Sequence, residues 1–201
     1  MNSNLDKQKI SELWSQLLSE IGEDTRRTGL QETPLRIAKM YEEMFRGYHT
    51  EYKPKITTFP NGEDGITYNQ MIIDEGSFYS FCEHHCLPFF GKYWFSYIPH
   101  SKGRIVGLSK VAHIIHFHSA RLQIQERLVK DVTDDLWKAL AQNSNEPKGM
   151  ALVMKAKHLC KTMRGIKQEG EMTTIELKGL FKEEQKTRQE FFNFVNGGLN
   201  G

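Results

Sequence analysis

Two short segments of the chain hold all three of its cysteines and three of its eight histidines. The first is Cys-Glu-His-His-Cys at residues 82–86, and the second is His-Leu-Cys at 158–160. Thiolate and imidazole are zinc ligands, and a structural zinc site uses four of them whereas a catalytic site keeps one position for water. Six candidates exceed either need, which favours three ligands with spare histidines for proton transfer. A fold that uses both segments in one site must bring together residues that are far apart in the sequence.

The spacing of the candidates limits which of them can share one ion. Cys82 and His85 stand three positions apart, so on a tight turn or one helical turn they point the same way. The adjacent His84 and His85 cannot easily face the same ion. On a strand, His158 and Cys160 would share one face and could both point into one pocket.

Composition favours a cytosolic globular protein that has no nucleic-acid or membrane partner. The 201 residues suit one domain with an accessory segment, and the net charge of +2 gives no sign of a polyanionic partner. No apolar run approaches the roughly 20 residues of a membrane span, and the polar N-terminus lacks the apolar stretch of a signal peptide. Three cysteines are few, and an odd number cannot all pair in disulfides, so metal binding or catalysis is favoured over a disulfide framework.

Two other interpretations of the cysteines and histidines stay open. They could be packed thiols and hydrogen-bonded imidazoles without any metal. A redox pair formed by Cys82 and Cys86 is the weaker alternative, because three residues separate them rather than the two of the common redox motif.

Hydrophobic periodicity predicts an α+β fold in which a helical pair precedes a ββααββ domain. Thr33 followed by Pro34 is a typical helix start, with Thr33 as the predicted N-cap. We expect an N-terminal helical segment over 1–48 and a catalytic domain over 49–201. The predicted elements are helices over 5–21 and 33–46, strands within 71–98, helices over 109–120 and 123–140, and strands over 150–160 and 172–178.

A set of motifs resembles the GTP cyclohydrolase I family. The segments FCEHHCLPFFGK, GLSK, QIQERL, HLC, MRG, GLF and TRQEF occur in that order, and the likeness runs from about residue 27 to residue 193. It implies a tunnelling fold, which is an antiparallel four-stranded sheet with two helices on one face. It also implies a homodecamer of two stacked pentameric rings, with active sites at the subunit interfaces.

The resemblance implies a role for particular residues as well. It assigns zinc ligands, catalytic histidines outside the metal shell, an acid that recognises the guanine edge with a glutamine beside it, and contacts to the triphosphate. The matching positions are Cys82, His85 and Cys160 for the metal; His84 and His158 for catalysis; and Glu126, Gln125, Ser109, Lys110, Arg164 and Arg36 for the substrate.

The implied activity is the zinc-dependent conversion of GTP to 7,8-dihydroneopterin triphosphate with release of formate, the first step of pterin and folate biosynthesis. One departure stands out, because the family commonly has Arg four residues after the Ser of GLSK and this chain has His113. The alternatives are a tunnelling-fold relative that acts on another purine or pterin, and a zinc-stabilised scaffold without catalysis. Spare histidines at 84 and 158 argue against a scaffold.

Overall fold

The computed structural model describes residues 5–141 and 143–199. The chain divides into two compact units, Met1–Tyr52 and Lys53–Gly201. Among the described residues, no helix combines the length and the apolar character needed to cross a membrane.

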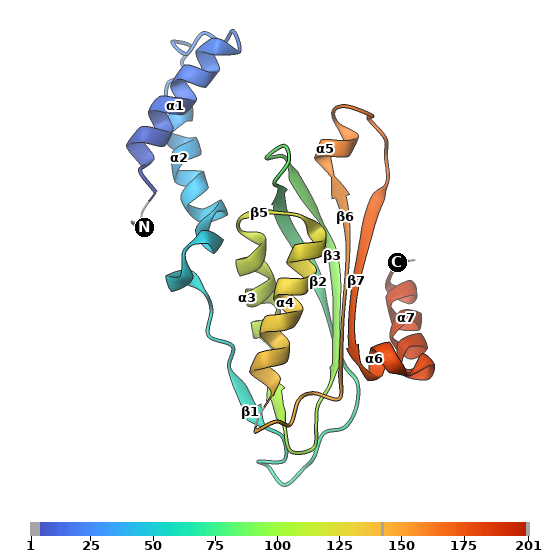
Figure 1. The fold of residues 1–201 in the computed structure, drawn as a ribbon. Helices are drawn as coiled ribbons and strands as arrows, with labels where there is room; N and C mark the ends of the chain where they lie inside the picture. The colour runs from blue at the N-terminus through green and yellow to red at the C-terminus, as the bar shows by residue number, and fades with distance from the viewer. Residues whose placement is uncertain (1–4, 142, 200–201) are drawn as a thin grey trace. The chain divides into compact units, whose positions relative to one another are not determined.

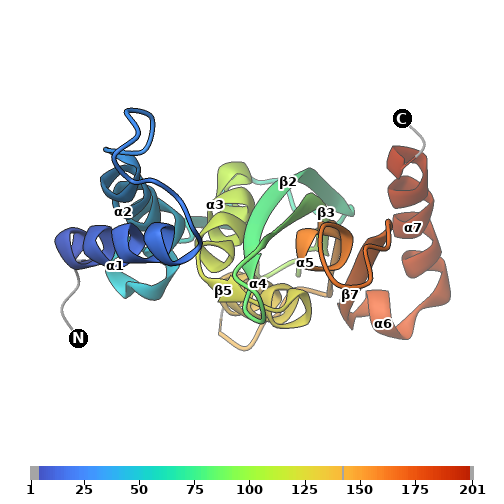
Figure 2. The same ribbon diagram turned by 90° about the horizontal axis from the view of Figure 1, so that it is seen from above.

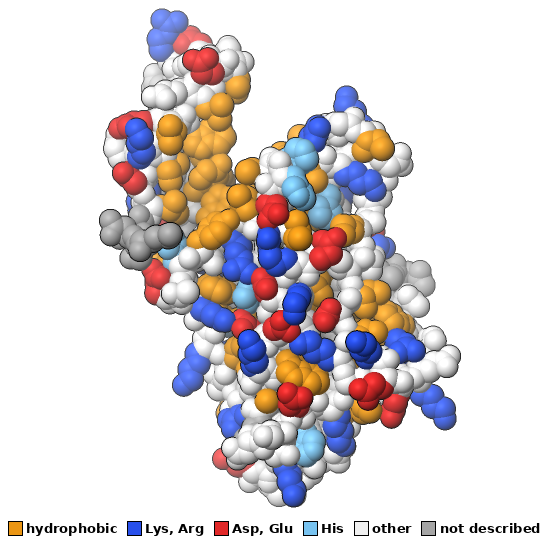
Figure 3. Space-filling model, viewed as in Figure 1, with side chains coloured by type: hydrophobic (Ala, Val, Ile, Leu, Met, Phe, Trp, Pro, Cys, Tyr) orange, Lys and Arg blue, Asp and Glu red, His pale blue; other side chains and the backbone are white. Residues whose placement is uncertain are grey.

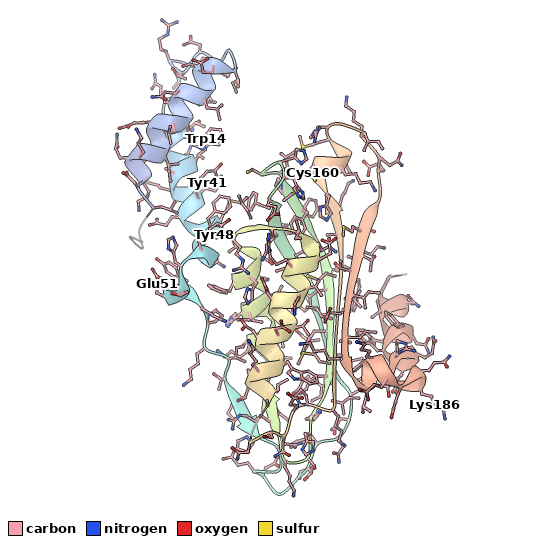
Figure 4. All side chains as sticks on the ribbon, viewed as in Figure 1. Trp14, Tyr41, Tyr48, Glu51, Cys160 and Lys186 are labelled. Atoms are coloured by element: carbon pink, nitrogen blue, oxygen red, sulfur yellow. The ribbon has the colours of Figure 1, made fainter. Side chains whose placement is uncertain are left out.

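The first unit is a pair of antiparallel helices joined by aromatic contacts. It consists of α1 (Lys7–Glu20), α2 (Thr33–Met44) and the short 3-10 turns η1 (Arg46–Tyr48) and η2 (Thr50–Tyr52). The Trp14 and Tyr41 rings meet edge to face with their centroids 6.1 Å apart (Figure 4). Within α1 only Leu18 is buried, and Figure 3 shows hydrophobic side chains exposed along the helical pair.

The predicted N-cap of α2 is wrong. The cap residue is Glu32, and Thr33 is already helical. The Thr33 hydroxyl donates to the Gly29 carbonyl at 3.2 Å, so it serves the preceding loop instead of the helix N–H groups. Pro34 lies in the first turn as predicted, where its missing N–H costs nothing.

The second unit is built on a five-stranded sheet in the order β5-β2-β3-β6-β7. Four long antiparallel strands form most of it, and β5 adds two residues in parallel to the end of β2. A separate ribbon pairs β1 (Thr58–Pro60) with β4 (Arg104–Val106). The sheet strands are β2 (Ile72–Cys82), β3 (Pro88–Ile98), β5 (Leu122–Gln123), β6 (Gly149–His158) and β7 (Glu171–Gly179).

Helices cover both faces of this sheet. On one face lie α3 (Leu108–Ser119) and α4 (Gln125–Leu140), as Figures 1 and 2 show. The apolar stripe predicted for α4 is confirmed, because Leu128, Val132 and Leu136 are fully buried in the main core. The ββααββ order and the α+β class are therefore confirmed.

The C-terminal helices were not predicted from periodicity. After β7 the chain forms α6 (Leu180–Glu183) and α7 (Gln185–Leu199), which cover the other face of the sheet. Phe181 and Phe191 are fully buried and pack with Trp94 from β3. A second, smaller core thus stabilises the sheet on the face opposite α3 and α4.

Candidate metal centre

The two cysteine-histidine segments meet at one end of the sheet. Cys82 ends β2, His85 lies in the following turn, and Cys160 lies in the one-turn helix α5 (Leu159–Thr162). Their ligand atoms all lie within 4.8 Å of one another, and in the described parts of the chain this is the only group of three or more such residues. Figure 4 shows Cys160 at the tip of β6, beside the β2–β3 turn.

Backbone hydrogen bonds explain why Cys82 and His85 share a side of the turn. The Cys82 N–H donates to the Leu87 carbonyl at 2.9 Å, and the Cys86 N–H donates back to the Cys82 carbonyl at 2.8 Å. Cys86 closes the turn in the left-handed region with φ of 54°, which few non-glycine residues adopt. The Cys86 thiol is exposed and does not belong to the cluster.

Cys160 reaches the cluster by a different route from the predicted one. A shared strand face for His158 and Cys160 is wrong, because β6 ends at His158 and α5 turns the chain before Cys160. Burial raises the pKa of the Cys160 thiol, and the neighbouring Cys82 sulfur raises it further. Two thiols and an imidazole whose ligand atoms lie this close together are a donor set that suits a divalent metal.

His158 is held neutral and oriented at the end of β6. Its ring stacks on Phe89, with centroids 4.6 Å apart and planes 3° from parallel. Its Nε2 lies 2.8 Å from Oε1 of Gln125. Burial lowers the His158 pKa, and the nearby Glu126 carboxylate opposes this only in part. A neutral imidazole can accept a proton, so His158 is suited to acid–base chemistry.

Two other predicted residues, His84 and Arg164, contact members of the cluster. His84 Nδ1 lies 3.7 Å from the Cys82 sulfur. Arg164 donates to His85 Nε2 at 2.5 Å, which brings a guanidinium to the metal ligands. Glu126 is exposed in the first turn of α4, where the helix N-terminus favours a negative charge.

Sequence reasoning missed a latch that holds the ligand turn, formed by Glu83, Gln123 and Arg127. The Arg127 guanidinium pairs with Glu83 and lowers the pKa of that carboxyl, and its Nε donates to Gln123 Oε1 at 2.8 Å. The Glu83 N–H donates to the Gln123 carbonyl at 3.0 Å. The position of Arg127 directly after the predicted pair Gln125 and Glu126 was the available signal.

Two predicted substrate residues lie away from this cluster within the second unit. Ser109 and Lys110 lie at the start of α3. The other end of this helix lies near the cluster, because the carbonyl of its last residue, Ser119, accepts from the Ser80 hydroxyl at 2.8 Å, two residues before Cys82 on β2. A helix of 12 residues is about 18 Å long, so the two ends of α3 serve different places. Arg36 belongs to the first unit, where it pairs with Glu32 at 3.2 Å.

An α+β domain that gathers two thiols and an imidazole beside further histidines is compatible with the class of proteins that have a Cys–His metal centre. Within that class the identity is given by comparison, because the family model of GTP cyclohydrolase I matches residues 10–196. The chain belongs to the GTP cyclohydrolase I family, and the tunnelling fold expected from the sequence is confirmed.

Several relatives named GTP cyclohydrolase 1 match nearly the whole chain. The protein from Caldanaerobacter subterraneus subsp. tengcongensis is 44% identical over 193 residues, covering 96% of this chain and 98% of the relative. The one from Sulfurihydrogenibium sp. is 44% identical over 194 residues, covering 96% of each chain. The one from Methylococcus capsulatus is 41% identical over 184 residues, covering 91% of this chain and 95% of the relative.

Proposed function

We infer that this protein converts GTP and one water to 7,8-dihydroneopterin triphosphate and formate, the entry reaction of pterin and folate biosynthesis. The observation that carries this inference is the family match over residues 10–196, together with relatives of the same name that align over nearly their full length. The chemistry needs a nucleophilic water, a proton carrier and a guanine-binding acid, and the cluster supplies a candidate for each.

Zinc is the metal we propose for the Cys82, His85 and Cys160 cluster. Two thiolates and one imidazole match zinc, and three protein ligands leave one coordination position for solvent. A zinc ion held there would supply a water of lowered pKa as the nucleophile for carbon 8 of guanine. Thiolate ligands also need a reducing compartment, which supports a cytoplasmic location.

His158 and His84 are the proposed proton carriers. His158 is neutral and partly buried next to the cluster, so it can take a proton from an attacking water and return it to a ring nitrogen. His84 has its Nδ1 3.7 Å from the Cys82 sulfur and is more exposed than His158. Each histidine thus has access to the reacting atoms without being needed as a ligand.

Substrate recognition divides between Glu126, Arg164 and residues outside this cluster. An ionised carboxylate is an acceptor only, so Glu126 can accept from both the ring N–H and the exocyclic amine of guanine. Arg164 can donate to phosphate oxygens in pairs. We assign Ser109, Lys110 and Arg36 to the triphosphate as well.

The separation of Ser109 and Lys110 from the cluster supports an assembly with sites between subunits. About 18 Å of helix lies between them, so a second copy must bring its own Ser109 and Lys110 to complete the phosphate site. In the described domain β7 pairs only with β6, and β5 covers only the last two residues of β2, so both edges can pair with neighbours. We propose a homodecamer of two pentameric rings.

The test is an assay of the purified protein with GTP, with and without zinc. We expect formate and a pterin that becomes fluorescent after oxidation, both abolished by a chelator and restored by added zinc. Light scattering on the same sample should give a mass near ten chains. Stoichiometric zinc with no product from GTP would refute the proposed activity and favour a scaffold, and turnover of another purine or pterin alone would favour a different member of the fold.

A further inference from the structure

Gln125 is a buried glutamine whose side-chain amide is bonded on both sides by protein. It is the first residue of α4, and only 1% of its surface is exposed. Its Nε2 lies 2.8 Å from the Met154 carbonyl, 3.2 Å from the Met172 carbonyl and 2.6 Å from the Thr174 hydroxyl. Its Oε1 lies 2.8 Å from His158 Nε2. The amide thus joins β6 and β7 to the ring of His158.

These contacts allow only one orientation of the amide. Backbone carbonyls are acceptors, so the group that faces Met154 and Met172 must be the NH₂ end. The reversed orientation would place Oε1 against two carbonyl oxygens and leave buried donors unpaired, which is costly. The oxygen of Gln125 therefore faces His158 whatever the state of that ring.

A fixed oxygen dictates which nitrogen of His158 carries the proton. A carboxamide oxygen can only accept, so the His158 nitrogen that faces it must donate. In a neutral imidazole one nitrogen is a donor and the other an acceptor, so the lone pair lies on Nδ1. The stacked Phe89 ring keeps the imidazole plane parallel to its own and hinders rotation of the imidazole about its Cβ–Cγ bond.

We propose that Gln125 is a positioning residue which holds His158 as the Nε2–H tautomer, so that Nδ1 is the nitrogen that exchanges protons with the substrate. This inference rests on the proposed function for its catalytic consequence, but the tautomer itself is a property of the free protein. It replaces the expectation from the resemblance that Gln125 contacts guanine, because the carboxamide has protein partners for both its nitrogen and its oxygen.

The decisive measurement is the nitrogen-15 NMR spectrum of His158 in the zinc-loaded full chain, assigned by comparison with His158→Ala. Two variants, Gln125→Met and Gln125→Glu, separate the acceptor from the bulk of the side chain. We expect wild type and Gln125→Glu to keep the proton on Nε2, because both place an oxygen there. Gln125→Met offers only a weak thioether acceptor and should give a mixture of tautomers.

Stability provides the contrast with a purely structural role. Gln125→Glu places a carboxyl oxygen against the Met154 and Met172 carbonyls and should therefore unfold more readily than Gln125→Met. The less stable variant, Gln125→Glu, should nevertheless be the one that keeps the wild-type tautomer of His158. Thr133→Val on the same helix is a matched control, because the buried Thr133 hydroxyl donates only to the Val129 carbonyl, at 2.7 Å. It should leave the His158 spectrum unchanged.

Turnover should follow the tautomer. For Gln125→Met we expect kcat with GTP to fall at least about tenfold with KM within about twofold, since support of a catalytic histidine is lost and no substrate contact is. A proton on Nδ1 in wild type, or an unchanged spectrum in Gln125→Met, would overturn the proposal, as would a raised KM with kcat intact. A wild type inactive on GTP would refute the proposed function, whereas the tautomer result would still stand by itself.

Discussion

Replacing Arg127 by Met tests whether the latch of Glu83, Gln123 and Arg127 orders the proposed metal ligands Cys82 and His85. Arg127 donates from Nε to Oε1 of Gln123, a residue with none of its surface exposed. The Gln123 amide cannot turn to find another donor, because its Nε2 is bonded to the His118 carbonyl at 3.0 Å. Arg127→Met keeps much of the apolar stem and leaves one buried oxygen without a donor.

The expected cost comes mainly from that oxygen. A buried acceptor that loses its donor costs about 1–3 kcal/mol. The ion pair between Arg127 and Glu83 is partly exposed on both sides, so solvent screens it and we assign it little. We therefore expect the free energy of unfolding of the metal-free protein to fall by about 1–3 kcal/mol, measured in urea at equal protein concentration because assembly shifts stability.

The same substitution should weaken zinc binding, since Glu83 lies between the ligands Cys82 and His85. If the whole destabilisation by Arg127→Met fell on ordering the turn from Cys82 to His85, each 1.4 kcal/mol would lower the zinc affinity about tenfold. Competition with a chromophoric chelator measures this affinity. Lys130→Met is the matched control, because Lys130 on the same helix pairs with Asp134 at the surface. Unchanged zinc affinity in a destabilised Arg127→Met would refute pre-ordering, and unchanged stability would refute the cost assigned to Gln123.

Three further predictions concern single side chains. Cys160→Ala should lose zinc, whereas His158→Ala should retain zinc by metal analysis and lose at least about a hundredfold in turnover with GTP; equal zinc loss in both would contradict the separation of their roles. Burial lowers the pKa of His118 in the folded protein below its ordinary value of 6.5. As the pH falls below 6.5, His118 therefore takes up a proton in the unfolded chain before it does so in the folded chain, and the free energy of unfolding measured in urea should decline. His118→Gln should flatten this decline, and an equally steep one would refute its origin in His118. His113→Arg should lower KM for GTP, because a guanidinium can donate to phosphate oxygens in pairs, and an unchanged KM would remove position 113 from the phosphate site.

Much of the second unit could be predicted from local patterns. The apolar period of α4 is set by burial against a sheet, and Leu128, Val132 and Leu136 are indeed fully buried. The C-terminal helices were missed because their burial depends on the far face of the sheet, which local spacing does not reveal. Phe181 and Phe191 form that second core with Trp94.

The candidate site was predictable in residue types and not in geometry. Spacing alone placed Cys82 and His85 on one side of a turn, which the hydrogen bonds of the turn explain. The strand argument for Cys160 was wrong, because α5 begins directly after His158. The hydrogen bonds of the Gln123 and Gln125 side chains depend on partners from other strands and helices. No sequence pattern could have shown which atoms these amides contact.

The length of α3 has a genetic consequence if the site is shared between copies. One copy carrying Cys160→Ala and another carrying Lys110→Ala would each be inactive alone. Mixed in one ring, they would form some sites that draw an intact cluster from one copy and an intact helix start from the other. Two such alleles could then restore activity together. Two defects that both lie in the cluster, or both at the start of α3, could not.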